Sequence, residues 1–170
     1  MNSEPEIENL GSFLNEFNKE SDRGAALIAA SLIDERLKDI IQNFLVDRKD
    51  SIVLLNGPNA VLGTLSARAS TAYALGLIQD NEYEEINIIR KIRNEYGHKW
   101  KGVSFEKDKI RNLCLRLPWL GPEEFEKGAT ARSRFDFAVT ILLTDLLWRA
   151  RLVRRERRKL KIWPNKSRAV

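Results

Sequence analysis

A short polar segment near the middle of the chain holds residue types that can bind a phosphate and move a proton. Residues 93–98 read RNEYGH, and His98 is the only histidine in the chain. On a helix, Asn94 and His98 are four residues apart and share one side. Arginine stabilises a dianion, histidine titrates near neutral pH, and an amide orients the ring. The segment therefore predicts an anion-binding or acid–base site at Arg93, Asn94 and His98, with helix capping by His98 as the alternative.

Arg68 is the second unusual residue, because it is a lone charge on an apolar helix. No other charged residue occurs between Val61 and Gln79. Burial of an unpaired charge is costly, so Arg68 needs a carboxylate, and Asp34 and Glu35 are the candidates. Two interpretations stay open: a structural ion pair, or an anion-binding arginine inside a cleft. The candidate ligand-binding set is Arg68, Arg93, Asn94, His98 and Glu35, and we expect Arg68 and His98 to open onto one common pocket.

The spacing of Arg93 and His98, with a polar residue directly after the arginine, resembles the signature of the HEPN superfamily of helical nucleotide-binding and RNA-cleaving domains. The resemblance implies metal-independent RNA cleavage, in which the 2′-hydroxyl attacks its own phosphate. Arg93 would then be the catalytic residue that stabilises the phosphorane, and His98 would act as acid or base. One histidine per chain implies that the two sites of a dimer meet across a symmetry axis.

Longer segments resemble the mannitol operon repressor family. They are residues 26–31 (ALIAAS), 62–68 (LGTLSAR) running on to 73–78 (YALGLI), and 82–85 (EYEE) leading into 93–98 and Phe105. The match covers residues 24–117 in family-like order and spacing. It implies an all-helical bacterial repressor of transcription of sugar-alcohol uptake genes. An ordinary DNA-reading motif is not evident, because the helix after the tight joint at residues 78–83 is acidic and phosphates would repel it.

The excess of positive charge lies in residues 149–170. This segment holds ten Lys and Arg against the single acid Glu156, a local charge of +9 in a chain of +5, so residues 1–148 carry −4. Trp148 and Trp163 flank the cations of residues 149–161 and are able to stack on bases. The candidate nucleic-acid-binding residues are Arg149, Arg151, Arg154, Arg155, Arg157, Arg158, Lys159 and Lys161. The alternatives are a solvated helix end, or docking to an acidic protein or to the chain's own acidic body.

The elements that must position these residues are all helices. Apolar residues recur at helical spacing over residues 5–19, 21–46, 61–78, 80–97, 104–116 and 130–161, with no alternation typical of strands. We therefore expect an all-α, single-domain bundle of five to seven helices with a long basic C-terminal helix. Residues 1–148 would form the bundle, with a family-like core at 24–117, and residues 149–170 a basic C-terminal extension.

Composition excludes several classes of site. The chain is 43% hydrophobic and 31% charged, which is typical of a soluble globular protein, and we expect it in the reducing cytoplasm. Its one cysteine, Cys114, excludes an internal disulfide and a multi-cysteine zinc site, and its apolar register predicts a buried, inert thiol. No metal site, no cofactor and no membrane span are expected.

Three functions follow as hypotheses. The first is a mannitol-operon-repressor-like transcriptional regulator that acts by binding rather than catalysis. The second is a HEPN-type endoribonuclease that uses Arg93 and His98. The third is an interaction protein that binds another regulator without contacting DNA. A homodimer is expected in each case, with nucleic acid or a protein as the partner.

Overall fold

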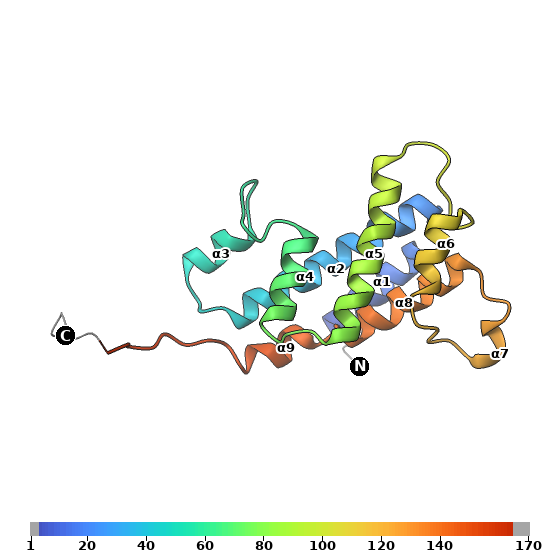
Figure 1. Ribbon diagram of the computed structural model, residues 1–170. Helices are drawn as coiled ribbons and strands as arrows, with labels where there is room; N and C mark the ends of the chain where they lie inside the picture. The colour runs from blue at the N-terminus through green and yellow to red at the C-terminus, as the bar shows by residue number, and fades with distance from the viewer. Residues whose placement is uncertain (1–3, 165–170) are drawn as a thin grey trace.

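The chain folds into one helical bundle, from which the C-terminal segment extends at one end (Figure 1). The structure is a computed structural model, and it describes residues 4–164. The all-α class predicted from the sequence is confirmed, since these residues hold helices and no strand. The helices are α1 (Pro5–Phe17), α2 (Asp22–Phe44), α3 (Lys49–Leu55), α4 (Leu65–Ala74), α5 (Asp80–His98), α6 (Asp108–Leu115), α7 (Glu123–Glu126), α8 (Ala131–Asp145) and α9 (Arg149–Arg154).

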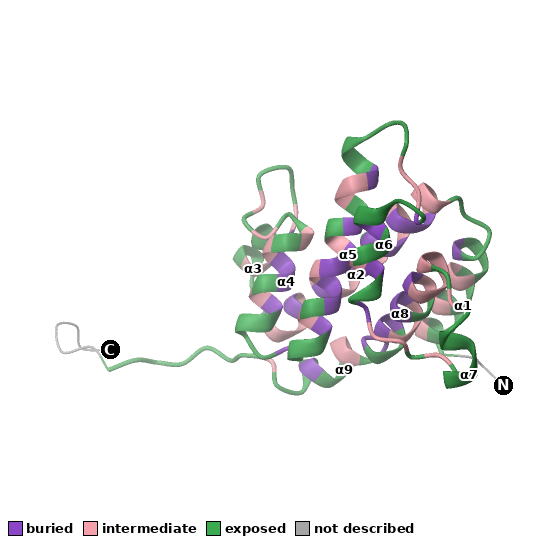
Figure 2. Cartoon of the chain, turned by 45° about the vertical axis from the view of Figure 1, so that its right-hand side comes forward, coloured by how far each residue is buried: buried purple, intermediate pink, exposed green. Residues whose placement is uncertain are grey.

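Helix α2 is the central element of the bundle, and it contacts α1, α3, α4, α5, α8 and α9. It begins where the sequence predicts, because the Ser21 hydroxyl accepts a hydrogen bond from the Gly24 N–H at 3.1 Å. Its buried residues run along its whole length, from Ala25 to Ile41. The buried positions of its neighbours face it (Figure 2). A helix buried on several sides in this way fixes the positions of the helices around it.

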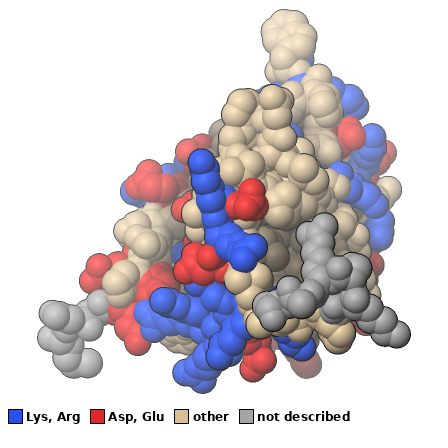
Figure 3. Space-filling view, turned by 90° about the vertical axis from the view of Figure 1, so that its left-hand side faces the viewer, with Lys and Arg blue, Asp and Glu red and all other residues tan. Residues whose placement is uncertain are grey.

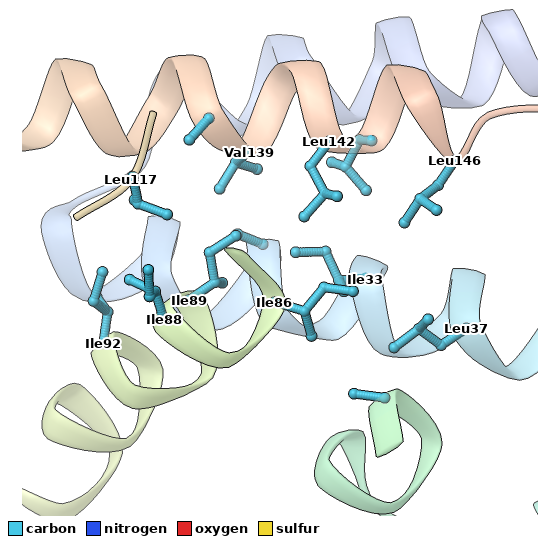
Figure 4. Close-up of a cluster of buried hydrophobic side chains, with 14 of the residues drawn as sticks. Ile33, Leu37, Ile86, Ile88, Ile89, Ile92, Leu117, Val139, Leu142 and Leu146 are labelled. Carbon is cyan, nitrogen blue, oxygen red and sulfur yellow. The ribbon is translucent and has the colours of Figure 1, made fainter. Parts of the chain in front are cut away.

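The apolar core lies between α2, α5 and α8, where side chains from the three helices interdigitate (Figure 4). Ile33 and Leu37 of α2 meet Ile86 and Ile89 of α5, and Leu142 of α8 closes the layer. All five are between 0% and 1% exposed. Burial of a Leu or Ile side chain contributes roughly 1.5–3 kcal/mol each, so this layer is a main source of stability.

Small residues bring α4 close to α2. Ala69 and Ala72 are fully buried, and α4 packs against both α2 and α5. The helix is shorter than the predicted 61–78, because Thr64 caps its start by accepting from the Ala67 N–H at 3.1 Å. At the other end Gly76 takes a φ of +69°, a conformation that ends helices and that glycine adopts without strain. Thr64, Leu65 and Ser66, at the start of α4, line a cleft between α4 and its neighbours.

Nine helices lie in the described residues, where five to seven were predicted, because three short helices had no clear periodic pattern. These are α3, α7 and α9. The C-terminal helix predicted over residues 130–161 is two helices, α8 and α9, separated by a turn that buries Leu146 and Leu147. After α9 the chain runs along the end of α2, where the Arg158 N–H donates to the Phe44 oxygen at 2.8 Å. Residues 165–170 of the predicted extension, with Lys166 and Arg168, lie outside the described residues.

Cys114 is fully buried in α6, as predicted. Burial raises the pKa of its thiol to about 12, so the reactive thiolate is scarce at neutral pH. Its protection from thiol reagents is therefore a convenient measure of whether the chain is folded.

Two absences concern the described part of the chain only. None of its helices has the length and apolar character needed to cross a bilayer. Between residues 4 and 164, no cluster of three or more His, Cys, Asp or Glu side chains is arranged to hold a metal ion.

Candidate functional site

A cleft of about 790 Å³ lies between α2, α4 and α5. Its apolar wall is formed by Leu27, Ile28, Ala30 and Leu65, and its polar residues are Ser31, Asp34, Thr64, Ser66, Arg90, Arg93 and Asn94. Small-molecule sites usually have volumes of roughly 300–1,000 Å³ and combine apolar walls with a few polar groups. The cleft therefore has the size and lining of a ligand site, and it contains two of the predicted residues, Arg93 and Asn94.

Arg68 is engaged inside the protein, since each of the three nitrogens of its guanidinium donates one hydrogen bond to a protein acceptor. Nε donates to the Leu62 oxygen at 2.8 Å, Nη2 donates to the Leu55 oxygen at 3.0 Å, and Nη1 pairs with Asp34. The residue is 7% exposed. Of the two predicted partners Asp34 is the one used, and Glu35 is exposed. The geometry thus favours the structural ion pair: Arg68 ties α2 to the end of α3 and to the loop before α4.

Asp34 joins this ion pair to the cleft. It pairs with Arg68 on one side and lines the cleft on the other. Burial raises the pKa of its carboxyl, while Arg68, Lys38 and Arg93 oppose that shift. Because Arg68 balances its charge, Asp34 does not make the cleft acidic.

The free positive charge of the cleft comes from Arg90 and Arg93, which lie three residues apart on α5. Arg93 Nη1 donates to Asn94 Oδ1 at 3.2 Å, and Arg90 Nη2 donates to Asn87 Oδ1 at 3.4 Å. Within residues 4–164 neither arginine forms an ion pair, and Arg90 Nε is buried without a hydrogen-bond partner. Sequence reasoning missed Arg90, although its spacing from Arg93 on one helix was available as a signal.

His98 does not reach the cleft, so the expected common pocket with Arg68 is wrong. It is the last residue of α5, it is exposed, and among the described residues it makes no hydrogen bond or ion pair. Five residues of helix place it about 140° around the axis from Arg93 and about 7.5 Å further along. It lies in the last turn of α5, as the capping alternative expects, but the backbone oxygens of Tyr96 and Lys99 at that end accept hydrogen bonds from Arg23 of α2.

The basic C-terminal segment is partly bound to the bundle. Arg149 forms a two-pronged ion pair with Glu82, at 2.7 and 3.0 Å, and donates to the Leu77 oxygen at 2.9 Å. Glu82 is only 3% exposed. Val153, one turn further along α9, is also buried. Arg149 therefore anchors α9 to the start of α5.

Two further arginines of the segment pair with acids of the bundle. Arg151 contacts Glu6 and, at 3.2 Å, Glu4, and it lowers the pKa of Glu6 by hydrogen bonding. Arg157 pairs with Asp47 at 3.0 Å. The other predicted residues, Arg154, Arg155, Arg158, Lys159 and Lys161, have exposed side chains.

On the face from which the segment leaves, Lys and Arg lie among Asp and Glu (Figure 3). Three of the eight residues predicted to bind nucleic acid, Arg149, Arg151 and Arg157, thus form ion pairs with acidic residues of the bundle.

Comparison with known proteins gives one informative match. No protein-family model matches the chain, and no curated protein does. Among solved structures, a chain of the MtlR–HPr complex from Escherichia coli matches with a TM-score of 0.56 and 25% identity, over 83% of this chain and 97% of that one. MtlR is the mannitol operon repressor. The fold is mannitol-repressor-like. This supports the fold expected from the resemblance of residues 24–117 and extends the likeness over most of the chain.

Proposed function

We propose that this chain is a mannitol-repressor-like regulator of transcription that acts by binding a protein partner. One observation carries the proposal: the chain matches a component of the MtlR–HPr complex along nearly all of that component's length. The likeness covers 83% of this chain, so most of the bundle has a counterpart in that component. The first and third hypotheses from the sequence are joined here, since the regulator would work through another protein. We place this function in the cytoplasm, in a homodimer.

The charges of the C-terminal segment favour a protein partner over nucleic acid. Arg149, Arg151 and Arg157 are paired with acids of the bundle. Each would have to leave its carboxylate before it could neutralise a phosphate. The exposed carboxylate of Asp80, in the first turn of α5 beside the anchored segment, would repel a phosphate backbone. Five of the eight candidate cations are exposed and form no ion pair within the described residues, and these would attract nucleic acid only by general electrostatics.

The ribonuclease hypothesis has less support from the arrangement of its two residues. Arg93 lines the cleft, whereas His98 lies outside it at the exposed end of α5. A general acid or base must come within hydrogen-bond reach of the reacting group. A second copy would therefore have to complete the site.

Titration with HPr tests the proposal. We expect purified HPr of the same species to bind this chain saturably in a calorimeter, with a dissociation constant of about 10 µM or tighter. The match with the MtlR–HPr complex is the reason for choosing this probe. The matched control is the double variant Lys159→Gln/Lys161→Gln, which removes exposed charge outside the bundle and should bind HPr equally well. Absence of heat with HPr at about 100 µM would refute partner binding of this kind.

A further inference from the structure

We infer that the cleft between α2, α4 and α5 binds a small organic phosphate, with Arg90 and Arg93 holding its phosphate group. This site goes beyond the proposed function and does not depend on the protein partner. It rests on the charge, the unused donors and the shape of the cleft.

Charge is the first observation. Arg90 and Arg93 both line the cleft from one side of α5, and within the described residues neither forms a direct ion pair, while Asp34 attracts Arg93 at longer range. Arg90 is half-buried, and most other buried or half-buried arginines of the chain have an acid, as Arg68 has Asp34, Arg132 has Asp136 and Arg149 has Glu82. Two guanidinium groups one helical turn apart and without direct ion pairs repel each other, and a ligand with two negative charges removes that cost.

Unused hydrogen-bond donors are the second observation. Among the described residues, the terminal nitrogens of Arg90 donate only to Asn87 Oδ1 and those of Arg93 only to Asn94 Oδ1, so most of their N–H groups have no acceptor in the protein. The hydroxyls of Ser31 and Ser66 and the amide of Asn94 stand on the same walls. The start of α4 lies there too, where backbone N–H groups add a partial positive charge. A tetrahedral phosphate presents three strong acceptor oxygens, which suits donors arriving from several elements.

The lining selects the class of anion. A phosphate monoester carries a charge of about −1.5 to −2 at pH 7, which matches two arginines, whereas a carboxylate or a sulfate ester would leave one unbalanced. Asp34 disfavours anions only weakly, because Arg68 holds its charge. The apolar wall of Leu27, Ile28 and Leu65 is suited to the organic part of an ester. A free phosphate ion would leave this wall uncovered.

Calorimetry with phenyl phosphate tests the site directly on the full chain. We expect saturable binding of phenyl phosphate that is about tenfold or more tighter than that of phenyl sulfate or inorganic phosphate, with no detectable binding of phenol. Comparison with phenyl sulfate shows whether the site requires two negative charges, because phenyl sulfate is a monoanion of the same shape. Comparison with inorganic phosphate shows whether the organic part of the ester contributes to binding.

Three variants locate the binding. Arg90→Gln and Arg93→Gln should each weaken phenyl phosphate binding about tenfold or more, because each removes a charged hydrogen-bond donor. Lys91→Gln removes the same charge from the position between them, where the side chain lines a different cavity, and should change binding less than about twofold. Protection of the Cys114 thiol verifies that each variant is folded. Arg93 is exposed, so Arg93→Gln keeps the test valid even where Arg90→Gln fails to fold.

Several results would overturn the inference. One is the absence of saturable phenyl phosphate binding by the wild-type chain at about 10 mM. Equal loss of binding in all three variants would mean general electrostatics and no site. Equal affinity for phenyl sulfate would refute the selectivity for a dianion. Equal affinity for inorganic phosphate would refute the selectivity for an organic ester. None of these results bears on HPr binding, so the inference and the proposed function fail separately.

Discussion

Replacing Arg149 with methionine is expected to lower the free energy of unfolding by about 3–5 kcal/mol, measured by urea denaturation. Glu82 is 3% exposed, and Arg149 is the cation that balances it. Removing the arginine leaves a charged carboxylate in the interior, which costs more than the ion pair itself contributes. It also frees α9, since the donor to the Leu77 oxygen is lost as well. Faster tryptic cleavage within residues 149–158 should accompany the loss.

The matched control for this prediction lies on the same helix. Arg154→Met removes the same charge from an exposed position and should change stability by less than about 0.5 kcal/mol. Adding Glu82→Gln to Arg149→Met should recover part of the lost stability, because the buried charge is then gone. Equal stability of Arg149→Met and Arg154→Met would show that the buried pair does not anchor the segment.

A large loss, about 3 kcal/mol, is also expected for Arg68→Met, again by urea denaturation. Three acceptors lose their donor at once: Asp34 and the backbone oxygens of Leu55 and Leu62. Asp34 keeps some access to water, with 28% of its side chain exposed, so the penalty is smaller than for Glu82. Because two of the acceptors belong to the end of α3 and the following loop, hydrogen exchange should accelerate between residues 55 and 62.

Glu35→Gln is the control for Arg68→Met. It changes an exposed carboxylate next to Asp34 and should leave the stability within about 0.5 kcal/mol of the wild type. If Arg68→Met proved equally harmless, Arg68 would not hold these segments together, and a role in ligand binding would again be open.

These anchors change how the basic segment has to be studied. Deleting residues 149–170 removes Arg149 and the buried Val153 together with the exposed cations, so loss of any activity would also reflect loss of structure. Substitution of exposed cations such as Lys159 and Lys161 separates charge from folding.

The long helices were predictable because local signals agreed with the packing. Ser21 at the start of α2 and the apolar stripe through Ile33 and Leu37 gave both its start and its buried side. The turn after α8 was not predictable, because it depends on a contact between Arg149 and Glu82, 67 residues apart. From the sequence alone, Glu82 belongs to an acidic first turn of α5, which is typical of a solvent-exposed segment. Only the tertiary structure shows that it is buried.

The site shows the same division between local and long-range information. A lone charge on an apolar helix has to find a partner, which is why burial of Arg68 and its pairing with Asp34 could be expected. His98 was misplaced because spacing along a helix does not show where the helix leaves the bundle. Arg90 was overlooked because a charge on an amphipathic helix is ordinarily solvated, and its role depends on the wall that α4 places opposite.

This chain is proposed to act by binding and not by catalysis, and incubation of the pure protein with single-stranded RNA in EDTA is the sharpest test of that proposal. Binding without catalysis predicts that the RNA stays as intact as it does in buffer, for the wild type and for His98→Ala alike. His98 is exposed, so the substitution leaves the fold in place. RNA cleavage by the wild type that disappears in folded His98→Ala would contradict the claim and identify a ribonuclease.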